Sequence, residues 1–197
     1  MKLIDARKDH YRRLAHEQGY RSRAAFKLKE LNKAYRIMGA GFYVLDLGCA
    51  PGGWMQVAVK LVGNQGKVLG VDTSYVEEIE GAQILKASIE DESTISEVLQ
   101  YFGKKADAVI SDLSPQVTGN WSVDHAKQIS LNYAAANIMD KVLSRKGNAL
   151  FKVFDGSYTT ELRDYLKKKF AKIKLTKPQA SRKQSSELYF VCLGYLG

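Results

Sequence analysis

Residues 45–54 read Leu45-Asp46-Leu47-Gly48-Cys49-Ala50-Pro51-Gly52-Gly53-Trp54, and they join an apolar strand pattern, Phe42–Leu47, to a glycine-rich turn and a following helix. Glycines let a backbone turn tightly and approach a ligand closely, and the next helix presents free N–H groups to that ligand. The turn lacks the Lys and the Ser or Thr of a phosphate-binding loop. An acid, Asp46, precedes it instead. This favours a positively charged cofactor such as S-adenosylmethionine over a pyrophosphate, although NAD and flavin stay open on this motif alone.

The net charge of +9 is unevenly distributed along the 197 residues. Residues 1–36 contain 11 Lys and Arg against 4 acids, residues 163–183 contain 9 against 1, and the remainder has a net charge of −6. Two basic regions around a mildly acidic middle are typical of a protein that binds a polyanion at its flanks and another ligand in between. We therefore expect a nucleic acid as partner. A merely solvated basic surface is the alternative.

Length and composition predict a single domain over residues 1–197 with a basic N-terminal extension. Cys49 and Cys192 are too few for a disulfide framework and lie in no metal-ligand spacing, which predicts a reducing environment and no bound metal. No N-terminal apolar run is long enough for a signal peptide or membrane span, so we expect a cytoplasmic protein without a membrane partner. The scattered histidines are expected at the surface, namely His10, His16 and His125.

Strand-like and helical patterns alternate along the chain. Strands are predicted at Phe42–Leu47, Lys67–Asp72, Gln83–Ser88, Ala106–Asp112, Asn148–Phe154, Lys172–Lys177 and Glu187–Tyr195. Helical patterns are predicted at Ala24–Tyr35 behind an N-cap at Ser22, Trp54–Val62, a short turn at Tyr75–Glu80, Asp91–Phe102, Val123–Ser144 and Thr159–Phe170. This alternation predicts an α/β fold with a mostly parallel seven-stranded sheet and helices on both faces. The last two strands are expected to form an antiparallel C-terminal hairpin.

Ionisable residues stand where an open α/β sheet binds its ligands, at the carboxyl ends of strands. Asp72 ends the second predicted strand, where nucleotide-binding folds place an acid on ribose hydroxyls, or it caps the next turn. Asp112 ends the fourth strand. Lys152 interrupts the apolar run Ala149–Phe154 of a strand that is covered on both faces, and Glu187 opens the last strand.

Lys152 is expected to have a carboxylate partner, because burying an unpaired ammonium group is costly. Asp112 is the natural partner on the neighbouring strand, and Glu187 is placed to approach from the other side. Such a cluster has a catalytic and a purely structural interpretation. Residue types alone leave both open.

Five motifs in this order resemble the FtsJ/RrmJ family of S-adenosylmethionine-dependent RNA ribose 2′-O-methyltransferases, called RlmE in its ribosomal branch. They are Tyr20-Arg21-Ser22-Arg23-Ala24-Ala25-Phe26-Lys27-Leu28, the glycine-turn run, Ser111-Asp112-Leu113-Ser114-Pro115, Phe151-Lys152-Val153-Phe154, and Lys177-Pro178-Gln179-Ala180-Ser181-Arg182 with Ser185-Ser186-Glu187-Leu188-Tyr189. The resemblance covers nearly the whole chain. It implies a Rossmann-like methyltransferase fold, S-adenosyl-L-methionine as cofactor, S-adenosyl-L-homocysteine as product, and no required metal.

The resemblance implies a catalytic tetrad of Lys27, Asp112, Lys152 and Glu187. Cofactor contacts are expected around the glycine turn and at the strand ends, at Asp46, Gly48, Gly52, Gly53, Trp54, Asp72, Ser88 and Asp112. One position departs from the family pattern. Relatives usually have an acid near the adenine after the third strand, where this chain has Ala87-Ser88. Either Ser88 with its backbone serves there, or Glu90 or Asp91 reaches in.

Methylation of a ribose 2′-oxygen requires the hydroxyl to lose its proton as it attacks. Lys152 is the candidate base, which requires its neutral amine. Burial, Lys27 and the sulfonium favour that form, whereas Asp112 and Glu187 oppose it. In the alternative, a charged Lys152 orients the hydroxyl and stabilises the alkoxide, and the proton goes to solvent or Asp112. Lys27 then completes a positive clamp, and Glu187 holds both lysines.

RNA is expected to bind the two basic regions on either side of the cofactor cleft, at Arg12, Arg13, Arg21, Arg23, Lys177, Arg182 and Lys183. The resemblance implies that the target is a uridine of large-subunit (23S-type) ribosomal RNA, free or in the assembling subunit. We expect a monomer. Two alternatives stay open. One is 2′-O-methylation of a tRNA anticodon loop or an mRNA cap, and the other is a non-catalytic RNA-binding factor in ribosome assembly.

Overall fold

The computed structural model describes the backbone of residues 3–182 and 184–197, and the side chains of these residues from position 10 onward. Seven strands form one sheet in the order β3-β2-β1-β4-β5-β7-β6. The first five run parallel, whereas β7 is antiparallel to both β5 and β6. The predicted sheet and its C-terminal hairpin are therefore confirmed. The strands are β1 (Tyr43–Leu47), β2 (Lys67–Asp72), β3 (Ala82–Lys86), β4 (Ala106–Ser111), β5 (Leu143–Phe154), β6 (Phe170–Thr176) and β7 (Glu187–Tyr195).

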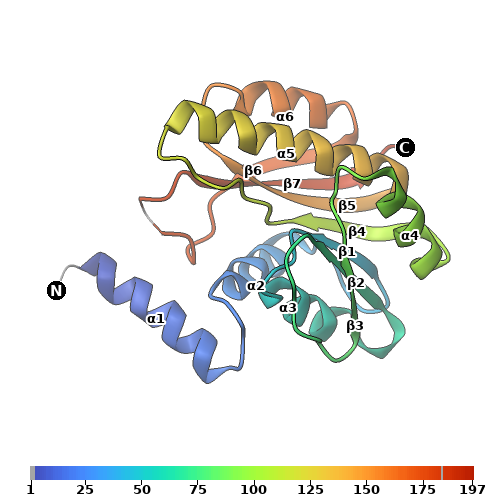
Figure 1. Ribbon diagram of the computed structural model, residues 1–197, viewed down its shortest axis with the longest axis horizontal. Helices are drawn as coiled ribbons and strands as arrows, with labels where there is room; N and C mark the ends of the chain where they lie inside the picture. The colour runs from blue at the N-terminus through green and yellow to red at the C-terminus, as the bar shows by residue number, and fades with distance from the viewer. Residues whose placement is uncertain (1–2, 183) are drawn as a thin grey trace.

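Helices cover both faces of this sheet (Figure 1). The second and third helices pack on one face, and the fourth, fifth and sixth pack on the other. None of the helices in the described residues is both long and apolar enough to span a membrane. The helices are α1 (Leu3–Glu17), α2 (Ala24–Tyr35), α3 (Gly53–Val62), α4 (Glu92–Phe102), α5 (Trp121–Val142) and α6 (Thr159–Lys167), with a short 3₁₀ helix, η1 (Gly63–Gln65), after α3.

The strand side chains alternate between two cores, because successive residues of a strand point to opposite faces. In β1, Val44 packs with α2 and α3, whereas Leu45 and Leu47 pack with α4, α5 and α6. In β5, Leu150 belongs to the α2–α3 side. Lys152 is two residues further along the same strand. The alternation therefore directs its side chain to the α2–α3 side, at the carboxyl end of the sheet.

Element boundaries differ from the prediction for local reasons. The side chain of Asn120 accepts hydrogen bonds from the N–H groups of Ser122 and Val123, so α5 begins two residues earlier than predicted. No side chain caps α2, which begins after Arg23, so the prediction of a cap at Ser22 was wrong. The predicted turn at residues 75–80 forms no helix.

Helix α1 was not predicted from the sequence. Among its described side chains, Ala15 is buried, and Tyr11 packs against Phe26 of α2 with ring centroids 5.6 Å apart. Figure 1 shows α1 beside α2, projecting from the rest of the protein. The contact between Tyr11 and Phe26 thus joins the described part of α1 to α2.

The prediction that His125 lies at the surface is wrong. Its side chain is 2% exposed, and its Nε2 accepts a hydrogen bond from the N–H of Tyr158 at 3.1 Å. Burial lowers the pKa of His125, and the nearby charge of Asp155 opposes this only in part. His10 and His16 are exposed, as predicted.

Candidate active site

Three acidic side chains lie at the carboxyl end of three neighbouring strands. Asp72 ends β2, Asp46 lies in β1, and Asp112 directly follows β4. Asp46 is fully buried, and neither of its carboxylate oxygens has a hydrogen-bond partner among the described residues. Burial raises the pKa of Asp46 well above its ordinary value, and the charges of Asp112 and Asp72 raise it further. This crowding of negative charge favours a cationic ligand at this edge.

The glycine turn between β1 and α3 leaves no room for side chains. Gly48 and Gly52 have φ angles of 76° and 105°, a region that L side chains rarely adopt. A Cβ atom on Gly52 would lie 2.6 Å from Cδ1 of Ile79, and one on Gly53 would lie 2.3 Å from Oγ of Ser22. The turn is therefore packed tightly under the loops that precede α2 and follow β2.

Asp72 connects the glycine turn to the end of β2. Its Oδ2 accepts the N–H of Ala50 at 3.0 Å, and its Oδ1 accepts the N–H of Ser74 at 2.8 Å. The residue therefore caps the next turn, as one of the two interpretations expected. Each carboxylate oxygen has two lone pairs, so the group keeps acceptor capacity for ribose hydroxyls. The two interpretations of Asp72 are compatible.

Lys152 is 5% exposed and pairs with Asp112, as predicted for neighbours on β4 and β5. Its Nζ donates to the backbone oxygen of Asp112 at 2.6 Å and lies 3.2 Å from Oδ1 of the same residue. The hydroxyl of Tyr189 donates to this Oδ1 at 3.1 Å. The lysine nitrogen is thus held by two oxygens of a single residue.

A second ion pair joins α2 to β7. Nζ of Lys27, a residue that is 6% exposed, donates to Oε2 of Glu187 at 2.8 Å. Burial by itself raises the pKa of Glu187, but the charge and hydrogen bond of Lys27, together with the charge of Lys152, lower it below its ordinary value. Lys27 also lies 5.7 Å from the ring centroid of Tyr189. Tyr189 therefore contacts both ion pairs, and the four predicted tetrad residues form one cluster.

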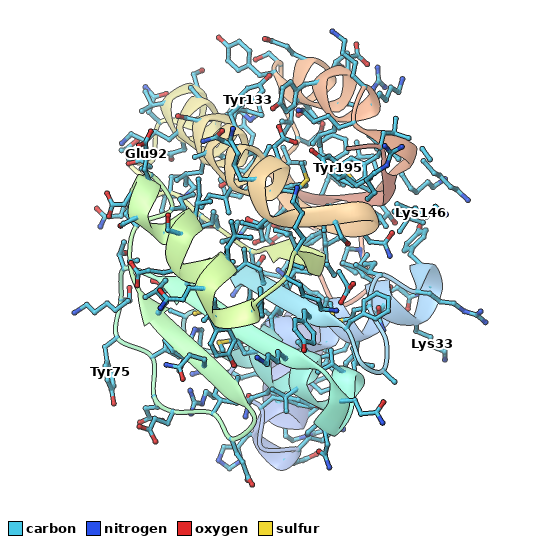
Figure 2. All side chains as sticks on the ribbon, turned by 90° about the vertical axis from the view of Figure 1, so that its right-hand side faces the viewer. Lys33, Tyr75, Glu92, Tyr133, Lys146 and Tyr195 are labelled. Carbon is cyan, nitrogen blue, oxygen red and sulfur yellow. The ribbon has the colours of Figure 1, made fainter. Side chains whose placement is uncertain are left out.

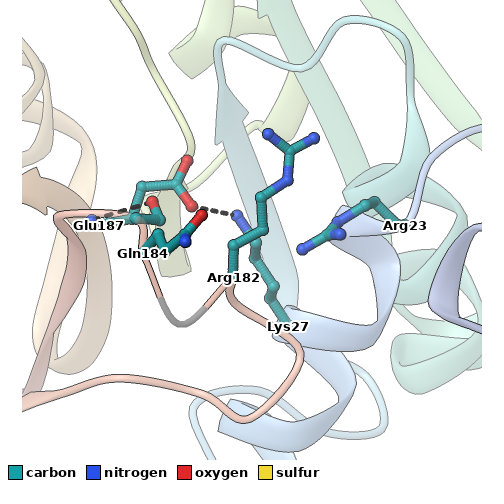
Figure 3. A pocket seen from close by; sticks show the side chains of 6 residues that line it. Arg23, Lys27, Arg182, Gln184 and Glu187 are labelled. Atoms are coloured by element: carbon teal, nitrogen blue, oxygen red, sulfur yellow. Dashed lines mark hydrogen bonds and ion pairs between the residues drawn. The ribbon is translucent and has the colours of Figure 1, made fainter. Parts of the chain in front are cut away.

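A pocket of about 380 Å³ opens at the Lys27–Glu187 pair (Figure 3). Arg23 and Arg182 line it beside Lys27, together with Gln184 and Ser185 of the loop before β7. Burial lowers the pKa of Arg23, and the charge of Arg182 lowers it further. Three cations against one carboxylate favour an anionic ligand, such as a phosphate group, in this pocket.

Two predicted cofactor residues already have partners within the protein. The indole N–H of Trp54 donates to the backbone oxygen of Ala24 at 2.8 Å, and the residue is 3% exposed. The hydroxyl of Ser88 accepts the N–H of Glu90 at 3.1 Å. Direct contacts of these two residues with a cofactor stay predictions.

Arg21 holds two loops together. Its guanidinium donates to the backbone oxygen of Pro51 in the glycine turn at 3.3 Å. It also donates to those of Glu77 and Glu78, in the loop after β2, at 2.7 and 2.8 Å. Arg21 thus stabilises the loops around the glycine turn, and its predicted contact with RNA stays a prediction.

Of the other basic residues predicted to bind RNA, Arg23 precedes α2 and lines the pocket, and the rest belong to α1 and to the segment before β7. Arg12 and Arg13 are exposed on α1, and Arg182 is exposed in the loop. Lys177 begins the same loop. Lys183 lies outside the described residues. The structure brings Arg182 to the pocket at the Lys27–Glu187 pair, whereas neither Arg12 nor Arg13 lines that pocket.

Gln128 is a site residue that sequence analysis missed. It is fully buried in α5, and its Nε2 donates to the backbone oxygens of Leu113 and Lys152, both at 3.0 Å. It thereby joins the loop that follows Asp112 to β5, the strand that contains Lys152. A signal was available in the sequence: Gln128 stands seven positions before Ala135 and therefore on the same, buried face of the helix.

Replacing Gln128 with leucine, which is similar in size, is expected to lower the free energy of unfolding by about 2 kcal/mol, because the buried backbone oxygen of Lys152 and the partly buried one of Leu113 lose their donor. Methyl transfer should fall as well, since Lys152 and Asp112 lose a common anchor. Denaturant unfolding and a turnover assay measure both effects. Asn132→Leu is the matched control, because its side chain donates only to the backbone oxygen of Gln128. Wild-type stability in Gln128→Leu would contradict this role.

The strand order, the glycine turn after β1, the acid ending β2 and the Lys–Asp–Lys–Glu cluster together define a Rossmann-like methyltransferase. The family model of FtsJ-like methyltransferases matches residues 20–195. The chain therefore belongs to the FtsJ-like methyltransferase family, and the resemblance seen in the sequence is confirmed.

Two archaeal proteins, each described as a ribosomal RNA large subunit methyltransferase E, are similar over the full length of both chains. The protein of Nitrosopumilus maritimus is 74% identical, and that of Cenarchaeum symbiosum is 67% identical, over 197 residues. Among solved structures, one described as a ribosomal RNA methyltransferase from Plasmodium falciparum has a TM-score of 0.81 and 29% identity. The match covers 90% of this chain and 100% of that one.

Proposed function

We propose that this protein transfers the methyl group of S-adenosylmethionine to a ribose 2′-hydroxyl of large-subunit ribosomal RNA, with a uridine as the target. The observation that carries the proposal is the joining of two Lys–carboxylate pairs, Lys152–Asp112 and Lys27–Glu187, into one cluster beside an acidic strand edge. The family membership and the similarity to ribosomal RNA methyltransferases support it.

The residues at the carboxyl edge of the sheet fit this cofactor. Asp46 has a buried carboxyl group without a hydrogen-bond partner among the described residues, and Asp72 and Asp112 add negative charge nearby. Such a site suits a sulfonium and an ammonium group. The N–H groups of Gly48, Cys49 and Gly52 donate to backbone oxygens of the protein itself, so the fit rests on the acidic side chains. When bound, the cofactor supplies a methyl group that is already activated toward a nucleophile, and it leaves as S-adenosylhomocysteine. Among the described residues, no cluster of His, Cys, Asp and Glu could hold a metal ion.

Lys152 acts on the nucleophile in this proposal. Its Nζ donates to the backbone oxygen of Asp112 at 2.6 Å and forms an ion pair with Oδ1 of the same residue at 3.2 Å. A neutral amine held in this way keeps its lone pair for the proton of the 2′-hydroxyl, whereas an ammonium keeps a third N–H for the developing alkoxide. Both forms satisfy the observed contacts. Lys27 and Glu187 fix the opposite side of the pocket, where the anionic RNA backbone enters.

The experiment that tests the function measures transfer of labelled methyl groups from S-adenosylmethionine to unmodified transcripts of large-subunit ribosomal RNA, with tRNA and capped mRNA as competing substrates. Transfer to a 2′-oxygen of the ribosomal transcript is the expected result. Preferential transfer to tRNA or to capped mRNA would show that one of these is the substrate. Binding of RNA without transfer would indicate a non-catalytic factor in ribosome assembly. We further propose a monomeric, cytoplasmic enzyme.

Asp72→Ala is expected to weaken binding of S-adenosylhomocysteine by about 1–3 kcal/mol, because ribose hydroxyls lose an acceptor and the glycine turn loses its tie to β2. Isothermal calorimetry measures the change. Asp107→Ala is the matched control, since Asp107 also accepts a backbone N–H, that of Tyr43 at 2.8 Å, but near the opposite end of its strand. Equal affinities of both variants and wild type would leave Asp72 with only its capping role.

Arg182→Glu and the double variant Arg12→Glu/Arg13→Glu are expected to weaken RNA binding and to flatten its salt dependence. Each lost phosphate contact should reduce the slope by about 0.7 on single strands, or about 0.9 on duplex if B-DNA values transfer. Arg21 is left unchanged because of its contacts with backbone oxygens. Arg145→Glu is the matched control, because Arg145 is exposed next to Lys146 (Figure 2), near the start of β5, whereas Lys152 lies near the end of that strand. If RNA affinity and its salt dependence were unchanged in both variants, the RNA would have to bind at another surface of the protein.

A further inference from the structure

Exposed apolar side chains gather beside the catalytic cluster. Among the described residues, six large hydrophobic side chains are exposed, and four of them lie in the two segments that follow β4 and β5: Val117, Trp121, Val123 and Tyr158. The same two strands carry Asp112 and Lys152 to this edge. The segments that carry these four side chains therefore leave the sheet at the same edge as Asp112 and Lys152.

Two aromatic rings of this patch are held in a fixed orientation. Trp121 and Tyr158 both stack on His125, with ring centroids 6.0 and 5.6 Å away and ring planes inclined by only 11° and 12°. Trp121 also contacts Phe154 at a centroid distance of 5.9 Å. His125 is buried, whereas Trp121 and Tyr158 are each 48% exposed. Each of the two exposed rings thus still offers ring surface to a ligand, and the pair that His125 joins, Trp121 and Tyr158, is called the platform here.

The platform of Trp121 and Tyr158 is firmly joined to the catalytic strand. Trp121, His125 and Gln128 stand at helical spacings of four and three on one face of α5, and Gln128 donates to the backbone oxygen of Lys152 at 3.0 Å. The N–H of Tyr158 donates to Nε2 of His125 at 3.1 Å. The position of the rings is therefore fixed relative to Lys152.

We infer that Trp121 and Tyr158 stack an unpaired RNA base next to the nucleotide that is methylated. This inference rests on the proposed function. A 2′-hydroxyl can reach a buried Lys152 only if the RNA is locally unstacked, and bases that leave a stack are commonly held on aromatic side chains. The cationic pocket at Arg23 and Arg182 holds the backbone, and the platform holds a base. In Figure 1, the start of α5 and the loop before β7 lie at the same edge of the molecule.

Tryptophan fluorescence provides a direct test, because the protein has only two tryptophans. Trp54 is 3% exposed, and Trp121 is 48% exposed. With S-adenosylhomocysteine at saturation, an unmodified transcript of large-subunit ribosomal RNA should quench the emission of Trp121. The quench should be absent in Trp121→Phe. RNA binding, seen by anisotropy of labelled transcript, without any change in Trp121 emission would overturn the inference.

Kinetics supply the second test. Trp121→Ala and Tyr158→Ala are each expected to raise KM for the transcript roughly tenfold or more, with unchanged affinity for S-adenosylhomocysteine. Trp121→Phe and Tyr158→Phe should restore KM to near wild type, since each keeps a ring. This rescue, with melting temperatures measured in parallel, separates stacking from loosened packing. Leu196→Ala should have no effect, because Leu196 is equally exposed at 48% but follows Tyr195 (Figure 2), at the other end of β7 from Glu187.

The outcomes distinguish the inference from the function on which it rests. Wild-type protein that methylates no RNA defeats the proposed function. If the wild-type protein is active, and both alanine variants keep its KM for the transcript, only the inference about base stacking is overturned. A Trp121→Ala variant that methylates naked transcript normally but fails on assembled subunits would overturn it as well, and would assign the patch to a ribosomal protein.

Discussion

Lys152→Ala is expected to reduce methyl transfer by about 10²–10⁴-fold, the range for a positioned group that moves or holds a proton in the transition state. Cofactor affinity should stay near wild type, because Lys152 contacts Asp112 and, in the proposed mechanism, acts on the nucleophile rather than on the methyl donor. Single-turnover transfer to the ribosomal transcript, together with calorimetry of S-adenosylhomocysteine, measures the two properties separately. A variant with more than roughly a tenth of the wild-type rate, a loss of less than about 1.4 kcal/mol, would remove Lys152 from the centre of the mechanism.

Lys152→Arg distinguishes the two forms of the mechanism. A guanidinium cannot be deprotonated in a protein, so the variant should be inactive if a neutral amine takes the proton. Substantial activity would assign Lys152 to the charged role, in which it orients the hydroxyl and stabilises the alkoxide. Lys146→Arg controls for the effect of a Lys-to-Arg substitution itself, because Lys146 is exposed and lies near the start of β5 (Figure 2).

Glu187→Gln is expected to lower the free energy of unfolding at neutral pH by about 2–3 kcal/mol, because the buried ammonium of Lys27 loses its counter-charge. The pKa of Glu187 is lowered in the folded protein, so its stabilising contribution is present above the unfolded value of about 4.3. It is lost as the pH falls through the lower folded pKa. The difference between wild type and variant should therefore shrink below about pH 4.

Denaturant unfolding between pH 3 and 7 measures this difference. Lys27→Met in the Glu187→Gln background should recover part of the stability at neutral pH, since it removes the unpaired charge. Methyl transfer should stay low in both variants. A constant difference across the whole pH range would show that the carboxylate of Glu187 is not what stabilises Lys27.

The Lys152–Asp112 pair could be predicted from the residues themselves, whereas the complete tetrad was implied by the resemblance. Lys152 interrupts an apolar strand, and Asp112 ends the neighbouring strand, so burial and topology together require their pairing. The pairing of Lys27 with Glu187 depended on the resemblance. No local pattern places a residue of α2 against the first residue of β7, 160 positions away.

Other features depend on tertiary contacts that have no local signal. Arg21 belongs to a basic region, which indicated RNA, but three backbone oxygens from two loops surround its guanidinium. His125 and Gln128 lie on the buried face of α5, near its N-terminal end. Both residues are polar, so a search for an apolar stripe does not find them. Polar residues at buried helical spacing were the signal that sequence analysis passed over.

Mapping of 2′-O-methyl groups in large-subunit ribosomal RNA tests the central claim most directly. RNA from cells that lack this protein is compared with RNA from the same cells expressing the wild type or Lys152→Ala. We predict that a single uridine 2′-O-methyl group is absent without the protein, returns with the wild type, and stays absent with Lys152→Ala. An unchanged methylation map in all three samples would contradict the assignment.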